Sequence, residues 1–120
     1  MSLVEWATAF FERLNEVSEA QRYLRLWDRC IEFRLLDGPT LHCQVLDGRL
    51  RVGYGPAPAG MTTTALQTDS GSLEEMMRGR LTFTETGAGQ AGRLRCVGGP
   101  SSFPDLSWVG ILMRLAQENR

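Results

Sequence analysis

Three consecutive segments in the first half of the chain, residues 30–36, 41–45 and 50–54, alternate apolar and other residues with a period of two. Each segment places its large apolar side chains on one face: Ile31, Phe33 and Leu35, then Leu41, Cys43 and Val45, then Leu50, Val52 and Tyr54. Such alternation is typical of strands with one buried face. Asp37-Gly38-Pro39 and Asp47-Gly48 are turn sequences between the segments. The pattern predicts an antiparallel meander that is apolar on one side.

Helical periodicity precedes this meander. Ser2 followed by Glu5 is a capping box, and apolar residues then recur at steps of three and four. These residues are Leu3, Ala7, Phe10, Leu14 and Val17, with Trp6 widening the apolar face. A second box, Ser18 with Gln21, indicates a further short helix. We therefore expect two N-terminal helices before the first strand.

The second half of the chain combines both periodicities. Residues 62–68 are rich in β-branched side chains and predict a fourth strand. Ser70 or Ser72 can cap a helix that ends at Gly79, and residues 92–98 predict a short fifth strand. A last amphipathic helix follows Pro100. The 120 residues predict a single α+β domain, with a five-stranded, mainly antiparallel sheet and helices packed on one of its faces.

Composition excludes several function classes. Thirteen basic and fourteen acidic residues give a formal net charge of −1, and no basic run indicates a nucleic-acid or anionic-membrane surface. No apolar run reaches the roughly 20 residues of a membrane span, so we do not expect an integral membrane protein. Charged residues interrupt the N-terminal apolar residues, so no secretory signal is expected. Cys30, Cys43 and Cys96 are odd in number and predict free buried thiols in a cytoplasmic protein.

The residues at the boundaries between the predicted elements of the second half resemble those of the sterol carrier protein family. The matching stretches are TALQTDSGSLEEMMRGRLTF, GRLRCVGG and SWVGILMRLA, with boundaries at Gly79-Arg80, Gly92-Arg93-Leu94 and Gly98. The resemblance covers most of the chain and implies a non-catalytic carrier of a lipid or another hydrophobic small molecule. Two features depart from the family pattern. Gly98-Gly99 lacks the acidic residue that often follows, and TFTETGAGQA is polar where the family often has an apolar, helical segment.

Motifs for catalysis or a cofactor are weak. Gly87, Gly89 and Gly92 form a GxGxxG pattern, but a strand follows it where a dinucleotide site needs a helix. His42 has Thr40 and Gln44 as its neighbours on one strand face, and it points away from Cys43. Neither a serine triad nor a zinc site fits that arrangement. We expect no enzyme activity, no cofactor and no metal.

Large apolar residues in the last third, together with the first helix, are the candidate ligand-binding residues. They are Phe10, Met76, Met77, Leu81, Phe83, Phe103, Leu106, Val109 and Leu112. As an ordinary core they would only pack together, whereas as a cavity lining they would hold a fatty acyl or sterol-like molecule. The alternative function is a protein–protein interaction or dimerisation module that has lost the lipid tunnel. In that case Trp27, Tyr54 and Trp108 would form an exposed aromatic patch, and a homodimer would be possible.

Overall fold

The computed structural model describes residues 2–81, 94–98 and 103–119, with the backbone alone for 98 and 103–106. Its elements follow one another as α1 (Leu3–Glu12), η1 (Arg13–Glu16), α2 (Ser18–Arg25), β1 (Arg29–Leu35), β2 (Thr40–Leu46), β3 (Arg49–Tyr54), β4 (Thr63–Thr68), α3 (Ser70–Met77), β5 (Arg95–Gly98) and α5 (Phe103–Glu118). Among these elements, no helix is long and apolar enough to cross a membrane.

The five strands form one sheet in the order β3-β2-β1-β4-β5. The pairs β1–β2, β2–β3 and β4–β5 are antiparallel, whereas β1 and β4 are parallel. The predicted meander is confirmed, and its second turn places Asp47 and Gly48 at φ values of 52° and 78°. Left-handed backbone of this kind is the geometry of a two-residue hairpin turn. The mainly antiparallel, five-stranded α+β architecture is therefore confirmed.

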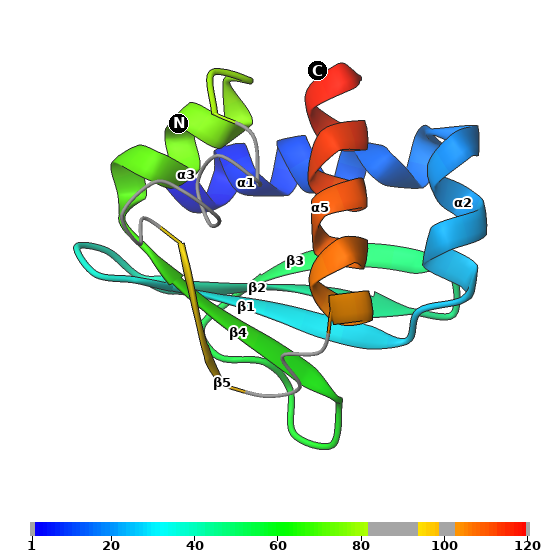
Figure 1. Ribbon diagram of the computed structural model, residues 1–120, viewed down its shortest axis with the longest axis horizontal. Helices are drawn as coiled ribbons and strands as arrows, with labels where there is room; N and C mark the ends of the chain where they lie inside the picture. Colours follow the sequence, from blue (N-terminus) through cyan, green and yellow to red (C-terminus); the bar gives the residue numbers. More distant parts are fainter. Residues whose placement is uncertain (1, 82–93, 99–102, 120) are drawn as a thin grey trace.

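Helices α1, α2, α3 and α5 lie on the same side of the sheet (Figure 1). We call the covered side the inner face; it carries Ile31, Phe33, Leu41, Val45 and Leu66, all of them buried. The opposite side is the outer face, along which the 55–62 connection runs from β3 to β4 (Figure 1). Alternation along each strand separates the two faces. All the large apolar residues predicted on one face lie on the inner side, but Tyr54, at the end of β3, is 72% exposed.

Local capping agrees with the predictions at one helix and corrects them at two. Ser2 Oγ accepts a hydrogen bond from Glu5 N at 3.1 Å, as the capping box predicts. The prediction that Ser18 caps α2 is wrong, because α2 has no side-chain cap. The Gln21 amide turns back instead, and donates to the Asn15 carbonyl at 2.8 Å.

Helix α3 begins on a different residue from the one expected. The prediction of a Ser70 or Ser72 cap is wrong, because Asp69 Oδ1 accepts the hydrogen bond from Ser72 N at 2.7 Å. Asp69 Oδ2 also accepts from the Ser72 hydroxyl at 2.9 Å. An ionised oxygen acceptor at the N-terminus satisfies a free N–H group and opposes the positive end of the helix dipole. Asp69 thereby fixes where β4 ends and α3 begins.

Side chains from the first helical segment satisfy the open edge of β3. The Asn15 amide donates to the Leu50 carbonyl and accepts from Leu50 N, both at 2.8 Å. Glu12 Oε2 accepts from Val52 N, also at 2.8 Å. An edge strand with unpaired N–H and C=O groups is a template for pairing with another chain. At Leu50 and Val52 these backbone groups already bond to side chains of the same chain, so they are not available to another strand.

Candidate functional site

The predicted ligand-binding residues that the structure describes meet in one apolar cluster. Phe10 comes from α1, Met76 and Met77 from α3, and Val109 and Leu112 from α5, and all five are buried. Leu81, just after α3, is partly buried against the same cluster. Phe83 lies outside the described residues, as do the side chains of Phe103 and Leu106, although their backbone belongs to α5. Three helices thus contribute to a layer over the inner face.

One polar side chain ties α3 to α5 beside this cluster. The Gln117 amide donates to the Met76 and Leu81 carbonyls, in both cases at 2.8 Å. Gly79 has a φ of 78°, the left-handed conformation that commonly ends a helix. The two bonds from Gln117 therefore hold the backbone on either side of that helix end. The amphipathic pattern of the last helix did not predict this contact, because Gln117 binds the carbonyls of residues that are far away in the sequence.

Two buried polar atoms have no hydrogen-bond partner within the described part of the chain. They are Trp27 Nε1 and Thr68 Oγ1. Thr68 ends β4 and lies opposite Leu35 on the inner face. Trp27 precedes β1 and belongs to the same apolar cluster as Val109 and Leu112. Buried polar groups are nearly always paired, so both atoms mark places where the described part of the interior lacks a partner.

The aromatic residues do not form the exposed patch that the protein–protein alternative requires. Trp27 is only 3% exposed and stacks on Trp108, with ring centroids 6.1 Å apart. Tyr23 contacts Trp108 edge-on at 5.0 Å. Tyr54 is exposed but lies on β3, and the aromatic contacts of Trp27 and Trp108 are with each other and with Tyr23. The condition of the alternative, joint exposure of these aromatic residues, is not met by Trp27, because stacking and burial place it in the core.

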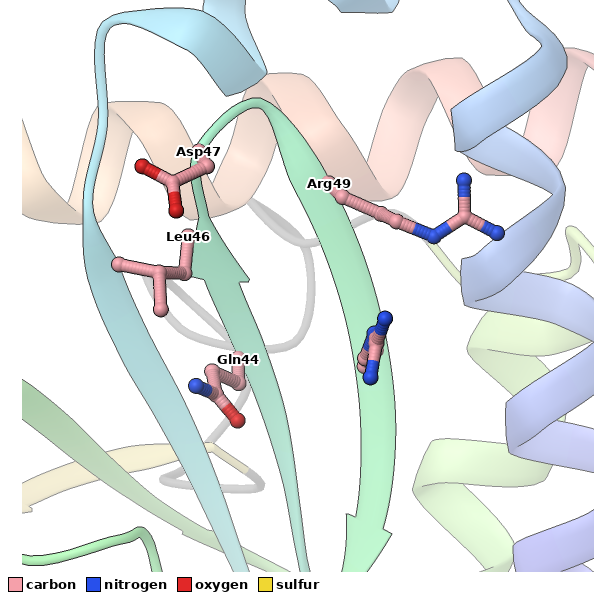
Figure 2. Close-up of a pocket in the computed structure, with 5 residues that line it drawn as sticks. Gln44, Leu46, Asp47 and Arg49 are labelled. Carbon is pink, nitrogen blue, oxygen red and sulfur yellow. The ribbon is translucent and has the colours of Figure 1, made fainter.

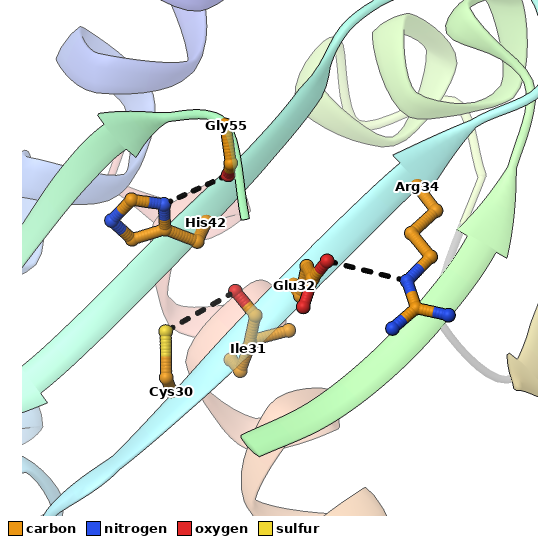
Figure 3. A network of polar contacts seen from close by, with 6 residues as sticks. All are labelled: Cys30, Ile31, Glu32, Arg34, His42 and Gly55. Carbon is orange, nitrogen blue, oxygen red and sulfur yellow. Dashed lines mark hydrogen bonds and ion pairs between the residues drawn. The ribbon is translucent and has the colours of Figure 1, made fainter. Parts of the chain in front are cut away.

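The outer face brings together three titratable side chains, two from β1 and one from β2. Glu32 and His42 lie opposite each other on β1 and β2, and Cys30 shares the outer face of β1 with Glu32 (Figure 3). Glu32 Oε1 pairs with Arg34 Nε at 3.2 Å, and His42 Nδ1 lies 3.0 Å from the Gly55 carbonyl oxygen. Sequence reasoning compared His42 only with neighbours on its own strand. The alternation in β1 predicts that Cys30 and Glu32 share a face. That His42 lies opposite Glu32 depends on the register between strands, which is tertiary information.

The Cys30 thiol is unsuited to nucleophilic chemistry. Burial, and secondarily the negative charge of Glu32, raise the pKa of Cys30 to about 12. Because the thiolate is the reactive form, this group stays protonated at neutral pH. Burial also raises the pKa of Cys43 well above its usual value. Within the described chain, no group of three His, Cys, Asp or Glu side chains is placed to hold a metal ion.

All three cysteines are free thiols, but the prediction that all are buried is wrong for one of them. Cys30 and Cys43 are buried, whereas Cys96 is exposed. Cys96 lies on β5, which is the last strand of the sheet and pairs only with β4. A short edge strand leaves its side chains uncovered, and Val97 beside it is exposed as well.

An open pocket of about 350 Å³ lies on the outer face of the β2–β3 hairpin (Figure 2). Its lining residues are Gln44, Leu46, Asp47, Arg49 and Arg51. The guanidinium groups of Arg49 and Arg51 are exposed, and Leu46 is the one apolar side chain of the lining. A hydrophobic ligand needs a mostly apolar enclosure. Among the described residues, the inner-face cluster is apolar, whereas the lining of this pocket is mostly polar.

Comparison with solved structures defines the fold. A sterol carrier protein 2 crystal structure is 18% identical and has a TM-score of 0.68, over 95% of this chain and 95% of that chain. Sterol carrier protein domain 2 of Helicoverpa armigera is 14% identical with a TM-score of 0.71, over 97% of this chain and 89% of that chain. A ubiquinone synthesis protein described as UbiJ-SCP2 is 14% identical with a TM-score of 0.63, over 95% and 91% of the two chains.

These likenesses extend over nearly the whole chain. The chain therefore has the sterol carrier protein fold, as the resemblance in its sequence implied. No protein-family model matches the sequence, and no curated protein matches it.

Proposed function

We propose that this chain binds a lipid or another hydrophobic small molecule between the inner face of the sheet and helices α1, α3 and α5, without catalysing a reaction. The observation that carries the proposal is the apolar cluster of Phe10, Met76, Met77, Val109 and Leu112 on a sterol carrier protein fold. Methionine side chains are flexible enough to fit varied apolar shapes. Leu81 lines the same region, and we include Phe83, Phe103 and Leu106 in the proposed lining from sequence alone.

Burial of the ligand supplies the binding free energy in this proposal. Each CH₂ group removed from water contributes about 0.8 kcal/mol, so ten methylenes give roughly 8 kcal/mol before costs. Lost translational and rotational freedom and the repacking of the methionines oppose that gain. We expect dissociation constants on the order of micromolar or weaker and little selectivity for chain shape. The protonated Cys30 thiol supports a carrier over an enzyme that uses this residue as its nucleophile.

The free cysteines support a location in a reducing compartment, which agrees with the cytoplasmic location expected from the sequence. The hydrogen bonds that Asn15 and Glu12 form with the edge of β3 support a carrier that does not pair through this edge. The alternative of a dimerisation module has less support, because Trp27 is buried.

Displacement of a fluorescent fatty acid tests the proposal, together with native mass spectrometry of freshly purified protein. Wild-type protein is expected to show saturable, competable binding. Met76→Ala should change the affinity at least several-fold, because it alters the lining of the cavity. Leu14→Ala removes an equally buried side chain from η1, a segment outside the proposed site, and serves as the matched control.

Both variants should lose about 2–5 kcal/mol of unfolding free energy, so a change in affinity confined to Met76→Ala cannot come from lost stability alone. Absence of saturable displacement and of any co-purified ligand would contradict the proposal. Equal effects of both variants on affinity would place the ligand elsewhere.

A further inference from the structure

Trp27 carries a buried indole N–H group that has no acceptor among the described residues. The side chain is 3% exposed, and Nε1 has no hydrogen-bond partner among the described residues. An indole nitrogen is a donor only, so no change of protonation or tautomer can satisfy it. Burial without an acceptor costs the donor its hydration. A ligand that carries an acceptor oxygen would remove this cost when it binds.

The indole ring is held so that its N–H points in one direction. Trp27 and Trp108 stack nearly parallel, with an interplanar angle of 10°, and Tyr23 packs edge-on against Trp108 at 79°. Such aromatic contacts restrict the rotation of the ring. The donor cannot be turned toward another acceptor without breaking the stack. Its position is therefore fixed before a ligand arrives, as a selective binding group requires.

Thr68 Oγ1 is the other unpartnered buried atom, and it is a weaker candidate. A hydroxyl group both donates and accepts, and its hydrogen rotates freely to suit its surroundings. Thr68 also directly precedes Asp69 and the first turn of α3, where polar atoms are frequent. Small movements there can supply a partner. The indole N–H of Trp27 can only donate, and its ring is restrained by the stack with Trp108.

We infer that Trp27 Nε1 donates a directional hydrogen bond to the bound molecule, whose polar end carries an acceptor oxygen. The inference rests on the proposed function and specifies its ligand class. Trp27 belongs to the buried apolar cluster, and its described ring contact is the stack with Trp108.

The position of the polar end follows from the order of the elements along the chain. Trp27 precedes the start of β1, whereas Thr68 lies opposite the end of that strand. The oxygen of the ligand accordingly lies at the Trp27 end, and its apolar body extends over the inner face toward Met76 and Met77.

The test compares 1-decanol with n-decane, which have similar apolar bodies but differ in the acceptor oxygen. In ¹⁵N-labelled protein, the indole N–H signals of Trp6, Trp27 and Trp108 are followed during titration, and Trp27→Phe identifies the signal of Trp27. 1-Decanol is expected to move the Trp27 indole proton downfield, and n-decane is not. Trp27→Phe keeps an aromatic ring but should weaken 1-decanol binding about five-fold, the effect of one neutral hydrogen bond, and leave n-decane binding unchanged.

Thr68→Val is the matched control, since it removes the other unpartnered atom and keeps the side-chain shape. It should leave the binding of both compounds unchanged. An unshifted Trp27 signal with bound 1-decanol would overturn the inference, as would loss of 1-decanol binding in Thr68→Val. Where Trp27→Phe does not fold, Trp6→Phe and Trp108→Phe identify the Trp27 signal by elimination, so the spectra of the wild-type protein still decide the question. If neither compound binds the wild-type protein, the proposed function itself fails.

Discussion

On the inner face of the sheet, Phe33, Leu41 and Leu66 are buried under helices. On the outer face, Glu32, His42 and Arg51 extend from the strands on the side that none of the described helices covers. Burial does not follow this division. Cys30, Glu32 and Ala65 on the outer face are also buried, on the side where the 55–62 connection runs. The comparison shows that the faces differ in chemistry more than in packing. The proposed ligand is placed on the inner side because the side chains there are apolar.

The largest expected effect is at the centre of the inner face. Phe33 is fully buried and stacks on Phe11 of α1, with ring centroids 5.8 Å apart. Phe33→Ala should lower the unfolding free energy by about 3–5 kcal/mol, because it leaves a cavity between sheet and helix. Arg51→Ala on the exposed outer face should change it by less than about 0.5 kcal/mol. Urea unfolding followed by circular dichroism measures both.

A milder variant keeps this test usable where the alanine variant does not fold. Phe33→Leu should cost less than Phe33→Ala, since most of the buried volume is retained. A loss for Arg51→Ala equal to that for the Phe33 variants would contradict the difference drawn between the two faces.

An intermediate effect is expected where the outer face is tightly packed. A Cβ atom on Gly53 would lie 2.5 Å from the Cε1 and Nε2 atoms of His42. Gly53→Ala must therefore displace the imidazole and strain its contact with Gly55, at a cost of about 1–3 kcal/mol. Thermal and urea unfolding measure the loss.

The double variant His42→Ala/Gly53→Ala separates this clash from other effects of the substitution. With the imidazole removed, the additional cost of Gly53→Ala should largely disappear. If the same cost persists without the imidazole, the outer face is not packed as described at this point.

The smallest expected effect comes from the buried thiol of the outer face. In the unfolded chain Cys30 ionises near pH 8.5, whereas in the folded protein its raised pKa of about 12 keeps it neutral. Its contribution to stability is therefore complete below about pH 8.5 and is lost as the pH rises toward 12. Between pH 9 and 10 the loss should be up to about 1 kcal/mol.

Urea unfolding at pH 7, 9 and 10 checks this dependence. Cys30→Ala should flatten the alkaline decline relative to wild type, whereas Cys96→Ala, which removes an exposed thiol, should leave it unchanged. Identical alkaline curves for wild type and Cys30→Ala would show that the Cys30 thiol is not kept neutral by the fold.

Much of the fold was predictable because strand alternation is a local property with a period of two. The meander, the Asp47-Gly48 turn and the placement of helices on one face all follow from it. The helix caps were less predictable. Ser18 and Ser70 have the right residue type, but Gln21 binds the Asn15 carbonyl and Asp69 caps α3. Which polar group bonds to a free N–H or C=O depends on the position and direction in which the preceding element ends.

The amino-acid order by itself determined which side chains share a face and which segments are strands or helices, because these depend on residues two to four positions apart. Tertiary structure decided the rest. It alone paired β1 with β4 in parallel, placed Glu32 opposite His42, buried Trp27 against Trp108, and gathered Phe10, Met76 and Leu112 into one cluster. The reason is physical: contacts between distant segments depend on register and packing, which no local periodicity encodes.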